Sequence, residues 1–77
     1  MELYQSREVT QLVNEFGDEI ELEMIQYNNH FYVIATICPD YPPFKDYIGR
    51  GKDPLSKRTA AKMALKELYV KAYPYLF

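Results

Sequence analysis

A chain of 77 residues, 48% hydrophobic and 16% aromatic, is long enough for one small domain with a core, which argues against a disordered tail. The single cysteine, Cys38, excludes an internal disulfide, and no cysteine–histidine cluster offers a zinc site. The net charge of −2 hides a division, because residues 1–44 hold eight acidic side chains and one basic one, whereas residues 45–77 hold eight basic and three acidic ones. The basic half can therefore attract a polyanion despite the negative total.

The first predicted element is a helix over about residues 7–16. Its apolar side chains follow the spacing i, i+3, i+4, i+7 of one helical face, and they are Val9, Leu12, Val13 and Phe16. Ser6 is a suitable N-cap, and Gly17 can supply the left-handed residue that commonly ends a helix. The pattern predicts an amphipathic helix with one face on the core.

The period then changes from helical spacing to strict alternation. Residues 19–24 alternate glutamate and apolar side chains, which predicts a strand with one solvent-exposed, negative face. Residues 31–37 are β-branched and aromatic and form the clearest predicted strand. Residues 44–48 are interpreted as a third, shorter strand, closed by Gly49 and Gly51. Short connections favour an antiparallel meander of these three strands.

The last predicted element is a long helix over about residues 54–72. Asp53 is expected to be its N-cap and Pro54 its first residue. Its core face carries small and apolar side chains, namely Ala60, Ala61, Ala64, Leu65 and Leu68. Arg58, Lys62 and Lys66 form a basic stripe on another side. The apolar tail, residues 73–77, is expected to fold back on this molecule or to cover a partner.

The sequence thus predicts a single α+β domain spanning residues 1–77, with a core over about residues 7–72. Its expected order is α-β-β-β-α, a three-stranded antiparallel sheet with both helices packed on the face opposite the glutamates. The start of the last helix is expected to hold phosphate, because free backbone N–H groups and cationic side chains meet there.

This order and the residues of the last helix resemble the double-stranded-RNA-binding domain. Gly49-Arg50-Gly51 matches the family's glycine pair, Ser56-Lys57-Arg58 resembles its basic helix opening, and residues 60–65 match its alanine-rich core run. Aligning the basic opening or the alanine run gives registers four residues apart, but Lys57 is basic in either. Ile48–Lys52 also resembles the glycine loop of a KH domain, although Lys52 stands where that loop needs its second glycine.

The resemblance implies shape-selective binding of double-stranded RNA, whose major groove is too narrow for side chains to read. The start of the last helix would contact phosphates, while the first helix and the loop around residue 30 would enter minor grooves. The residues expected to contact RNA are Lys57, Arg58, Lys52, Lys62, His30, Glu15, Gln11 and Asn14.

The alternative is a protein-interaction or dimerisation module with weak or no RNA binding. It is suggested by the acidic first half, the apolar tail, and Tyr32 and Ile34 on the exposed sheet face. No nucleophile–base or metal-ligand constellation is apparent, so we expect neither an enzyme nor a cofactor. With no apolar run of membrane-spanning length and no signal-peptide pattern, an intracellular location, cytoplasmic or nuclear, is expected without a membrane partner.

Overall fold

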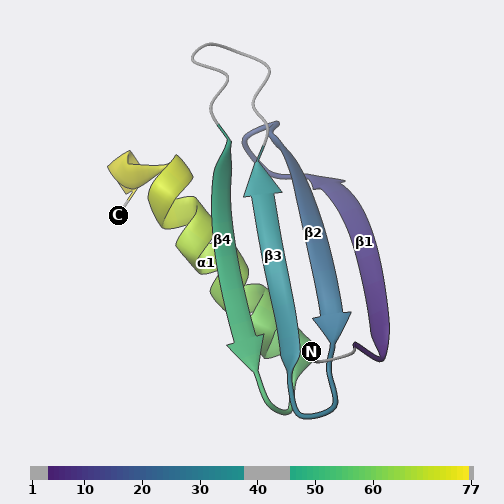
Figure 1. Cartoon of the computed structure of the whole chain (residues 1–77). Helices are drawn as coiled ribbons and strands as arrows, with labels where there is room; N and C mark the ends of the chain where they lie inside the picture. Colours follow the sequence, from purple (N-terminus) through teal and green to yellow (C-terminus); the bar gives the residue numbers. More distant parts are fainter. Residues whose placement is uncertain (1–3, 38–45, 77) are drawn as a thin grey trace.

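The computed structural model of the chain describes residues 4–37 and 46–76. Its elements are β1 (Ser6–Val13), β2 (Glu19–Gln26), β3 (Phe31–Ile37), β4 (Tyr47–Asp53), the helix α1 (Lys57–Ala72) and a short 3₁₀ turn, η1 (Pro74–Leu76). The four strands form one antiparallel sheet in the order β1-β2-β3-β4, and α1 lies across one face of it (Figure 1). The predicted α-β-β-β-α order is therefore wrong, because a fourth strand replaces the first helix.

The segment predicted as the first helix is β1, which pairs along its whole length with β2, from Ser6 opposite Gln26 to Val13 opposite Glu19. Gly17 does adopt the left-handed conformation, with φ of +83°, but it closes the β1–β2 hairpin instead of ending a helix. The Asn14 side-chain oxygen accepts hydrogen bonds from the backbone N–H groups of Phe16 and Asp18, which fixes this turn.

The remaining strands agree more closely with the sequence. The alternation over residues 19–24 and the apolar run at residues 31–37 correspond to β2 and β3. The third predicted strand was placed too early, since β4 runs through Gly49 and Gly51 and ends at Asp53. Residues 44 and 45 of the predicted strand lie outside the described residues.

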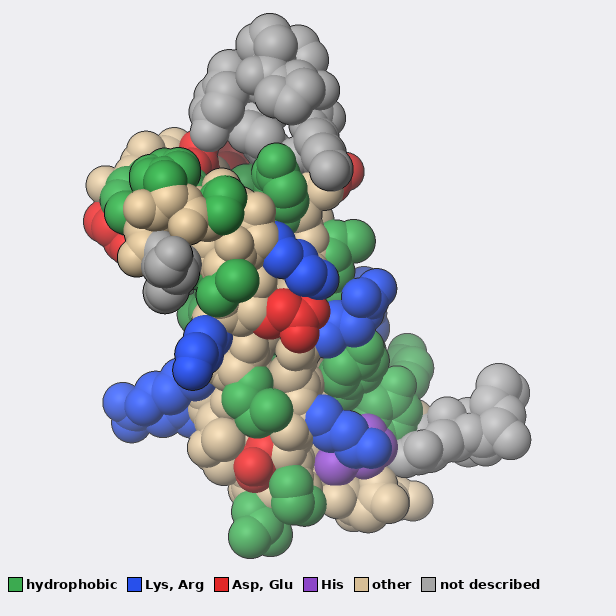
Figure 2. Space-filling model, turned by 90° about the vertical axis from the view of Figure 1, so that its left-hand side faces the viewer, with side chains coloured by type: hydrophobic (Ala, Val, Ile, Leu, Met, Phe, Trp, Pro, Cys, Tyr) green, Lys and Arg blue, Asp and Glu red, His purple; other side chains and the backbone are tan. Residues whose placement is uncertain are grey.

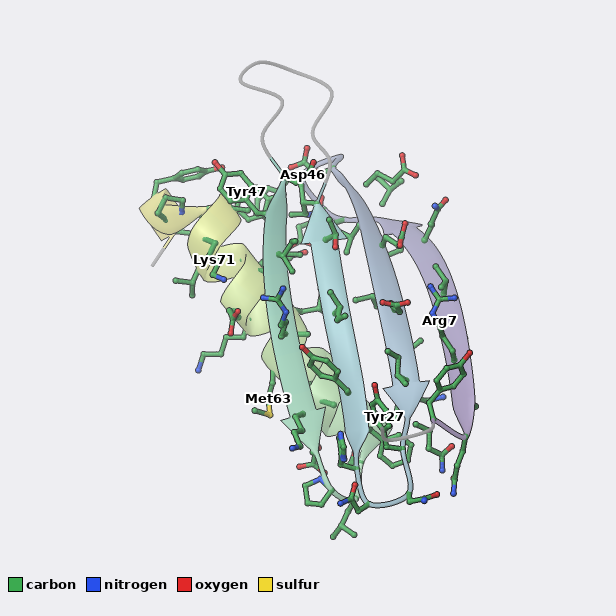
Figure 3. All side chains as sticks on the ribbon, viewed as in Figure 1. Arg7, Tyr27, Asp46, Tyr47, Met63 and Lys71 are labelled. Carbon is green, nitrogen blue, oxygen red and sulfur yellow. The ribbon has the colours of Figure 1, made fainter. Side chains whose placement is uncertain are left out.

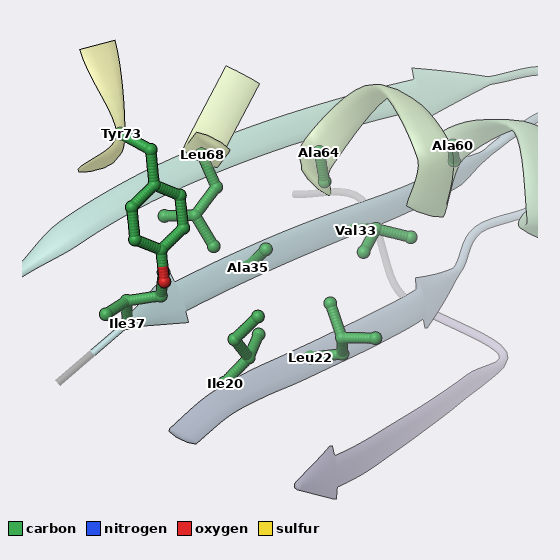
Figure 4. Close-up of a cluster of buried hydrophobic side chains, with 9 residues drawn as sticks. All are labelled: Ile20, Leu22, Val33, Ala35, Ile37, Ala60, Ala64, Leu68 and Tyr73. Carbon is green, nitrogen blue, oxygen red and sulfur yellow. The ribbon is translucent and has the colours of Figure 1, made fainter. Parts of the chain in front are cut away.

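The core lies between the sheet and α1, on the face opposite the β2 glutamates, as predicted for the last helix. Its buried side chains are Ile20, Leu22, Val33, Ala35, Ile37, Ala60, Ala64, Leu68 and Tyr73 (Figure 4). The expected core face of the helix is confirmed, with Ala61 and Leu65 partly buried beside the fully buried residues. A single helix is narrower than four strands, and α1 covers chiefly β3 and β4.

The helix α1 begins later than predicted, at Lys57 instead of Pro54. Ser56 is the N-cap, and its hydroxyl accepts a hydrogen bond from the Thr59 N–H at 3.1 Å. The Asp53 carboxylate instead accepts from the N–H groups of Leu55 and Ser56, which holds the turn that precedes the helix. Pro54 lies in this turn and is not the first helical residue.

The predicted apolar tail divides into two parts. Tyr73 folds back and is 3% exposed, and its ring packs against Phe16 and Tyr69. Tyr75 and Leu76, in η1, remain exposed. Phe77 lies outside the described residues.

Candidate nucleic-acid interface

The charge division of the sequence becomes a division in space. The β1–β2 hairpin, residues 6–26, carries six acidic side chains and one basic one, whereas residues 47–72 of β4 and α1 carry seven basic and two acidic ones. The strand order places the hairpin and β4 at opposite margins of the sheet. The molecule therefore has an acidic margin and a basic margin, and Figure 2 shows basic side chains gathered on the latter.

Three cations follow one side of α1 at four-residue spacing, and we name Arg58, Lys62 and Lys66 the α1 basic stripe. All three are exposed, because the buried residues Ala60 and Ala64 turn the opposite side of the helix toward the sheet. Among residues 4–37 and 46–76, no carboxylate forms an ion pair with any of them. Within the described part of the chain, the stripe is thus a line of positive charge without an ion-pair partner.

Lys57, the best single candidate from the sequence, points toward β1 instead of joining the stripe. Its ammonium nitrogen lies 3.6 Å from the Glu8 carboxylate, and both side chains are at least half exposed. An exposed ion pair of this kind contributes only about 0–1 kcal/mol, so the lysine remains available to a stronger anion.

Lys52 and His30 are brought together at the end of the sheet where β4 approaches the β2–β3 turn. They line a shallow hollow with Tyr27 and Tyr32. The His30 ring stacks on Tyr27 at 4.7 Å between centroids, and its Nδ1 lies 2.6 Å from the side-chain oxygen of Asn29. The register puts Lys52 opposite Tyr32, on the face of the sheet away from α1, so this pair does not continue the stripe.

The three residues assigned to the first helix are not placed as predicted. Gln11 lies within β1, opposite Glu21, and Glu15 is exposed in the β1–β2 turn. Asn14 is fully engaged, since its amide nitrogen also donates to the Tyr73 hydroxyl at 2.9 Å. The β1–β2 and β2–β3 turns lie at opposite ends of the strands, so these residues are remote from His30 (Figure 1).

Sequence reasoning missed a pair on α1 that covers the outer edge of β4. Lys71 donates to the carbonyl oxygen of Ile48 at 2.9 Å and to the Glu67 carboxylate at 3.0 Å. Hydrogen bonding from Lys71, its charge, and the backbone N–H of Arg50 lower the pKa of Glu67. The i, i+4 spacing of a glutamate and a lysine was the signal available in the sequence. Lys71 therefore has a structural role at this edge.

Within the described parts of the chain, no group of three or more histidine, cysteine, aspartate or glutamate side chains is placed to hold a metal ion. No described helix is long and apolar enough to cross a membrane. In comparisons with known proteins, no family model, curated protein or solved structure matches this chain.

Proposed function

We propose that this chain binds double-stranded RNA by its phosphate backbone, through the α1 basic stripe. The observation that supports this most is the stripe itself, a line of three exposed cations without a carboxylate partner among the described residues. The acidic side chains lie mainly at the other margin of the sheet, so they do not cancel this charge.

The spacing of the stripe suits a row of phosphates. At a rise of ~1.5 Å per residue, Arg58 and Lys66 are ~12 Å apart along the helix, so the stripe can contact successive phosphates of one strand. Lys57 lies in the first turn and can join by exchanging Glu8 for a phosphate. We assign the RNA duplex as ligand from the resemblance of the residues of β4 and α1 alone, since the α-β-β-β-α order that formed the other part of the resemblance is not observed.

Without a first helix, minor-groove contacts from residues 7–16 are not part of the proposal. Phosphate contacts fix affinity and position but do not distinguish sequences, so binding is independent of sequence and strongly dependent on salt. This differs from the shape-selective mode, which requires contacts in two successive minor grooves.

The test is fluorescence anisotropy with a labelled 20-base-pair RNA duplex, titrated at several salt concentrations. The double variant Lys62→Gln/Lys66→Gln should bind about tenfold more weakly and lower the slope of log K against log salt by about 1–2. Arg7→Gln is the control for loss of positive charge outside the stripe, because it removes one cation from the acidic margin and should leave affinity unchanged. Equal affinity of the double variant and the wild type would contradict the proposal.

The form of the nucleic acid needs a separate comparison. Phosphate contacts alone do not distinguish RNA from DNA, so stronger binding of the RNA duplex than of a DNA duplex or single strands of the same sequence is what the resemblance predicts, and the same titration measures it. If all of these ligands bind equally and all respond to the double variant, the stripe is a general polyanion site and the assignment to duplex RNA is wrong.

A further inference from the structure

The face of the sheet away from α1, which we name the open face, mixes apolar and charged side chains. The residues of this face that matter here are Glu19, Glu21 and Glu23 of β2, Ile34 of β3, and Arg50 and Lys52 of β4. Figure 3 looks onto this face, with Arg7 on β1 near its acidic margin. Its charges are ordered, with acids on β2, apolar or neutral residues on β3 and bases on β4.

One set of directly paired residues on β2, β3 and β4 shows this acidic–apolar–basic order. Glu23 is paired with Ile34, and Ile34 is paired with Arg50. Ile34 is the middle residue of β3, and Arg50 is the middle residue of β4. At ~4.8 Å between strands, Glu23 and Arg50 stand at about equal distances on either side of an apolar centre.

We propose that two copies of this chain pack through their open faces around a two-fold axis that runs along β3. This two-fold rotation leaves each row of cross-strand neighbours at the same position along the strands. It places β2 of one copy over β4 of the other. It places Ile34 against the partner's Ile34. It also places Glu23 against the partner's Arg50, and the same contact recurs on the other side of the axis. The interface is thus isologous, with each patch complementary to itself.

The distribution of charge favours a second copy of the chain as the partner and favours an axis along β3. A two-fold axis running across the strands would lay β2 on the partner's β2, so that three glutamates on each copy would meet like charges. The axis along β3 instead opposes β2 and β4 in both halves. Two sheets packed face to face lie ~10 Å apart and within ~30° of alignment, which keeps the central row in contact while the corners diverge.

The groups needed for this contact are only partly engaged within one copy. Arg7 donates to one oxygen of the Glu23 carboxylate, which leaves the other oxygen to accept from a partner. Arg50 is near Glu67, but that carboxylate already binds Lys71. A guanidinium has five N–H donors, so Arg50 can reach a second carboxylate.

Sedimentation velocity over about 10 μM to 1 mM tests the association, because a small interface of this kind is expected to be weak. The wild type should show a concentration-dependent monomer–dimer equilibrium. Ile34→Glu should be a monomer throughout, since it places two carboxylates on the axis. Lys62→Glu, a charge change on the far side of α1, should associate like the wild type. A wild type that stays monomeric, or an Ile34→Glu variant that still dimerises, overturns the proposal.

Mixing two variants tests the pairing itself. Arg50→Glu alone should be monomeric because it opposes Glu23 of the partner subunit, and Glu23→Lys alone should be monomeric because it opposes a partner arginine. In a 1:1 mixture both contacts become attractive again, so a heterodimer should form. If the mixture remains monomeric while both variants are folded by circular dichroism, the proposed axis is wrong. RNA binding is not involved in any of these readouts.

Discussion

At the scale of single residues, two glycines determine how closely α1 lies on the sheet. A Cβ atom at Gly51 would be 2.7 Å from the backbone nitrogen of Ala64 and closer still to the carbonyl oxygen of Ala60. A Cβ atom at Gly49 would lie 2.9 Å from the Cβ of Leu68. The backbone of β4 therefore contacts the backbone of α1 almost directly, and no side chain larger than hydrogen fits between them.

Gly51→Ala should destabilise the protein by about 3 kcal/mol, because overpacking against backbone atoms forces the helix and strand apart. Gly17→Ala is the comparison, since a Cβ atom there meets nothing within 4 Å. The loss of stability there comes only from the strain of an alanine at positive φ, about 1 kcal/mol. Urea denaturation of both variants measures the two free energies of unfolding. Equal losses would show that the close approach at Gly51 is not the cause.

The sequence pointed to these glycines but gave them a different role. A glycine pair after a hydrophobic run indicates the end of a strand, and that interpretation placed β4 too early. Whether a glycine makes a turn or admits a neighbouring helix depends on what packs above it. The packing of α1 on β4 joins residues that are far apart in the sequence, so the local pattern could not distinguish a turn glycine from one that admits a helix. The small residues of α1, Ala60 and Ala64, were by contrast identified as its core face, because helical periodicity is a local property.

At the scale of elements, β1 shows why a short amphipathic stretch is ambiguous. Its apolar residues fit a helical face, whereas in the strand Val9 and Val13 lie on one face and Leu12 lies on the other, so the apolar pattern does not indicate a strand. Pairing with β2 supplies a full ladder of backbone hydrogen bonds, and that long-range gain overrides the local pattern. All of β1 is exposed, so it contributes little to the buried core from which a sequence pattern is normally recognised.

The end of α1 is joined to the β1–β2 turn through Tyr73. Its hydroxyl donates to the Asp18 carboxylate and accepts from the Asn14 amide. Burial, followed by the hydrogen bond to Asp18, raises the pKa of this phenol above its ordinary value. The neutral form is thus favoured in the folded state, so this contribution to stability is present below the ordinary pKa of ~10 and is lost as pH rises above it.

Tyr73→Phe should therefore lower stability at pH 7 by about 1–2 kcal/mol, because it leaves Asp18 and Asn14 without this partner. Above a pH of ~10 the variant should lose stability less steeply than the wild type, since it lacks the titrating phenol. Urea denaturation between neutral and alkaline pH measures both effects. Tyr75→Phe, at an exposed position, is the control. Parallel curves for Tyr73→Phe and the wild type would contradict the assigned role.

At the scale of the whole molecule, the separation of charge could be foreseen from the sequence, but its direction in space could not. The strand order of the meander turns two oppositely charged halves of the chain into two margins. Of the predicted RNA contacts, Arg58 and Lys62 share an exposed side of α1, whereas Lys52 and His30 lie on the open face and Asn14 serves the hairpin. The contacts assigned to the first helix are not grouped with the others, because that segment is the strand β1 and its turn.

The α1 basic stripe and the open face lie on opposite sides of the sheet, so the two proposed activities should be separable. Ile34→Glu should abolish self-association and change RNA affinity less than about twofold, a shift below ~0.5 kcal/mol. Lys62→Gln/Lys66→Gln should have the reverse effect. Anisotropy and sedimentation on the same two preparations measure this, and a variant that impairs both activities while remaining folded would show that the sites overlap.

The covering of the β4 edge by Glu67 and Lys71 has a consequence for growth into fibrils. A ribbon of many copies joined strand to strand needs two receptive borders on every copy, one to receive a neighbour and one to offer to the next. Here the Ile48 carbonyl already accepts a hydrogen bond from the Lys71 ammonium group, and the charged side chains of Glu67 and Lys71 lie along the same edge of β4. A further strand could therefore pair with this part of β4 only after Lys71 has left the Ile48 carbonyl.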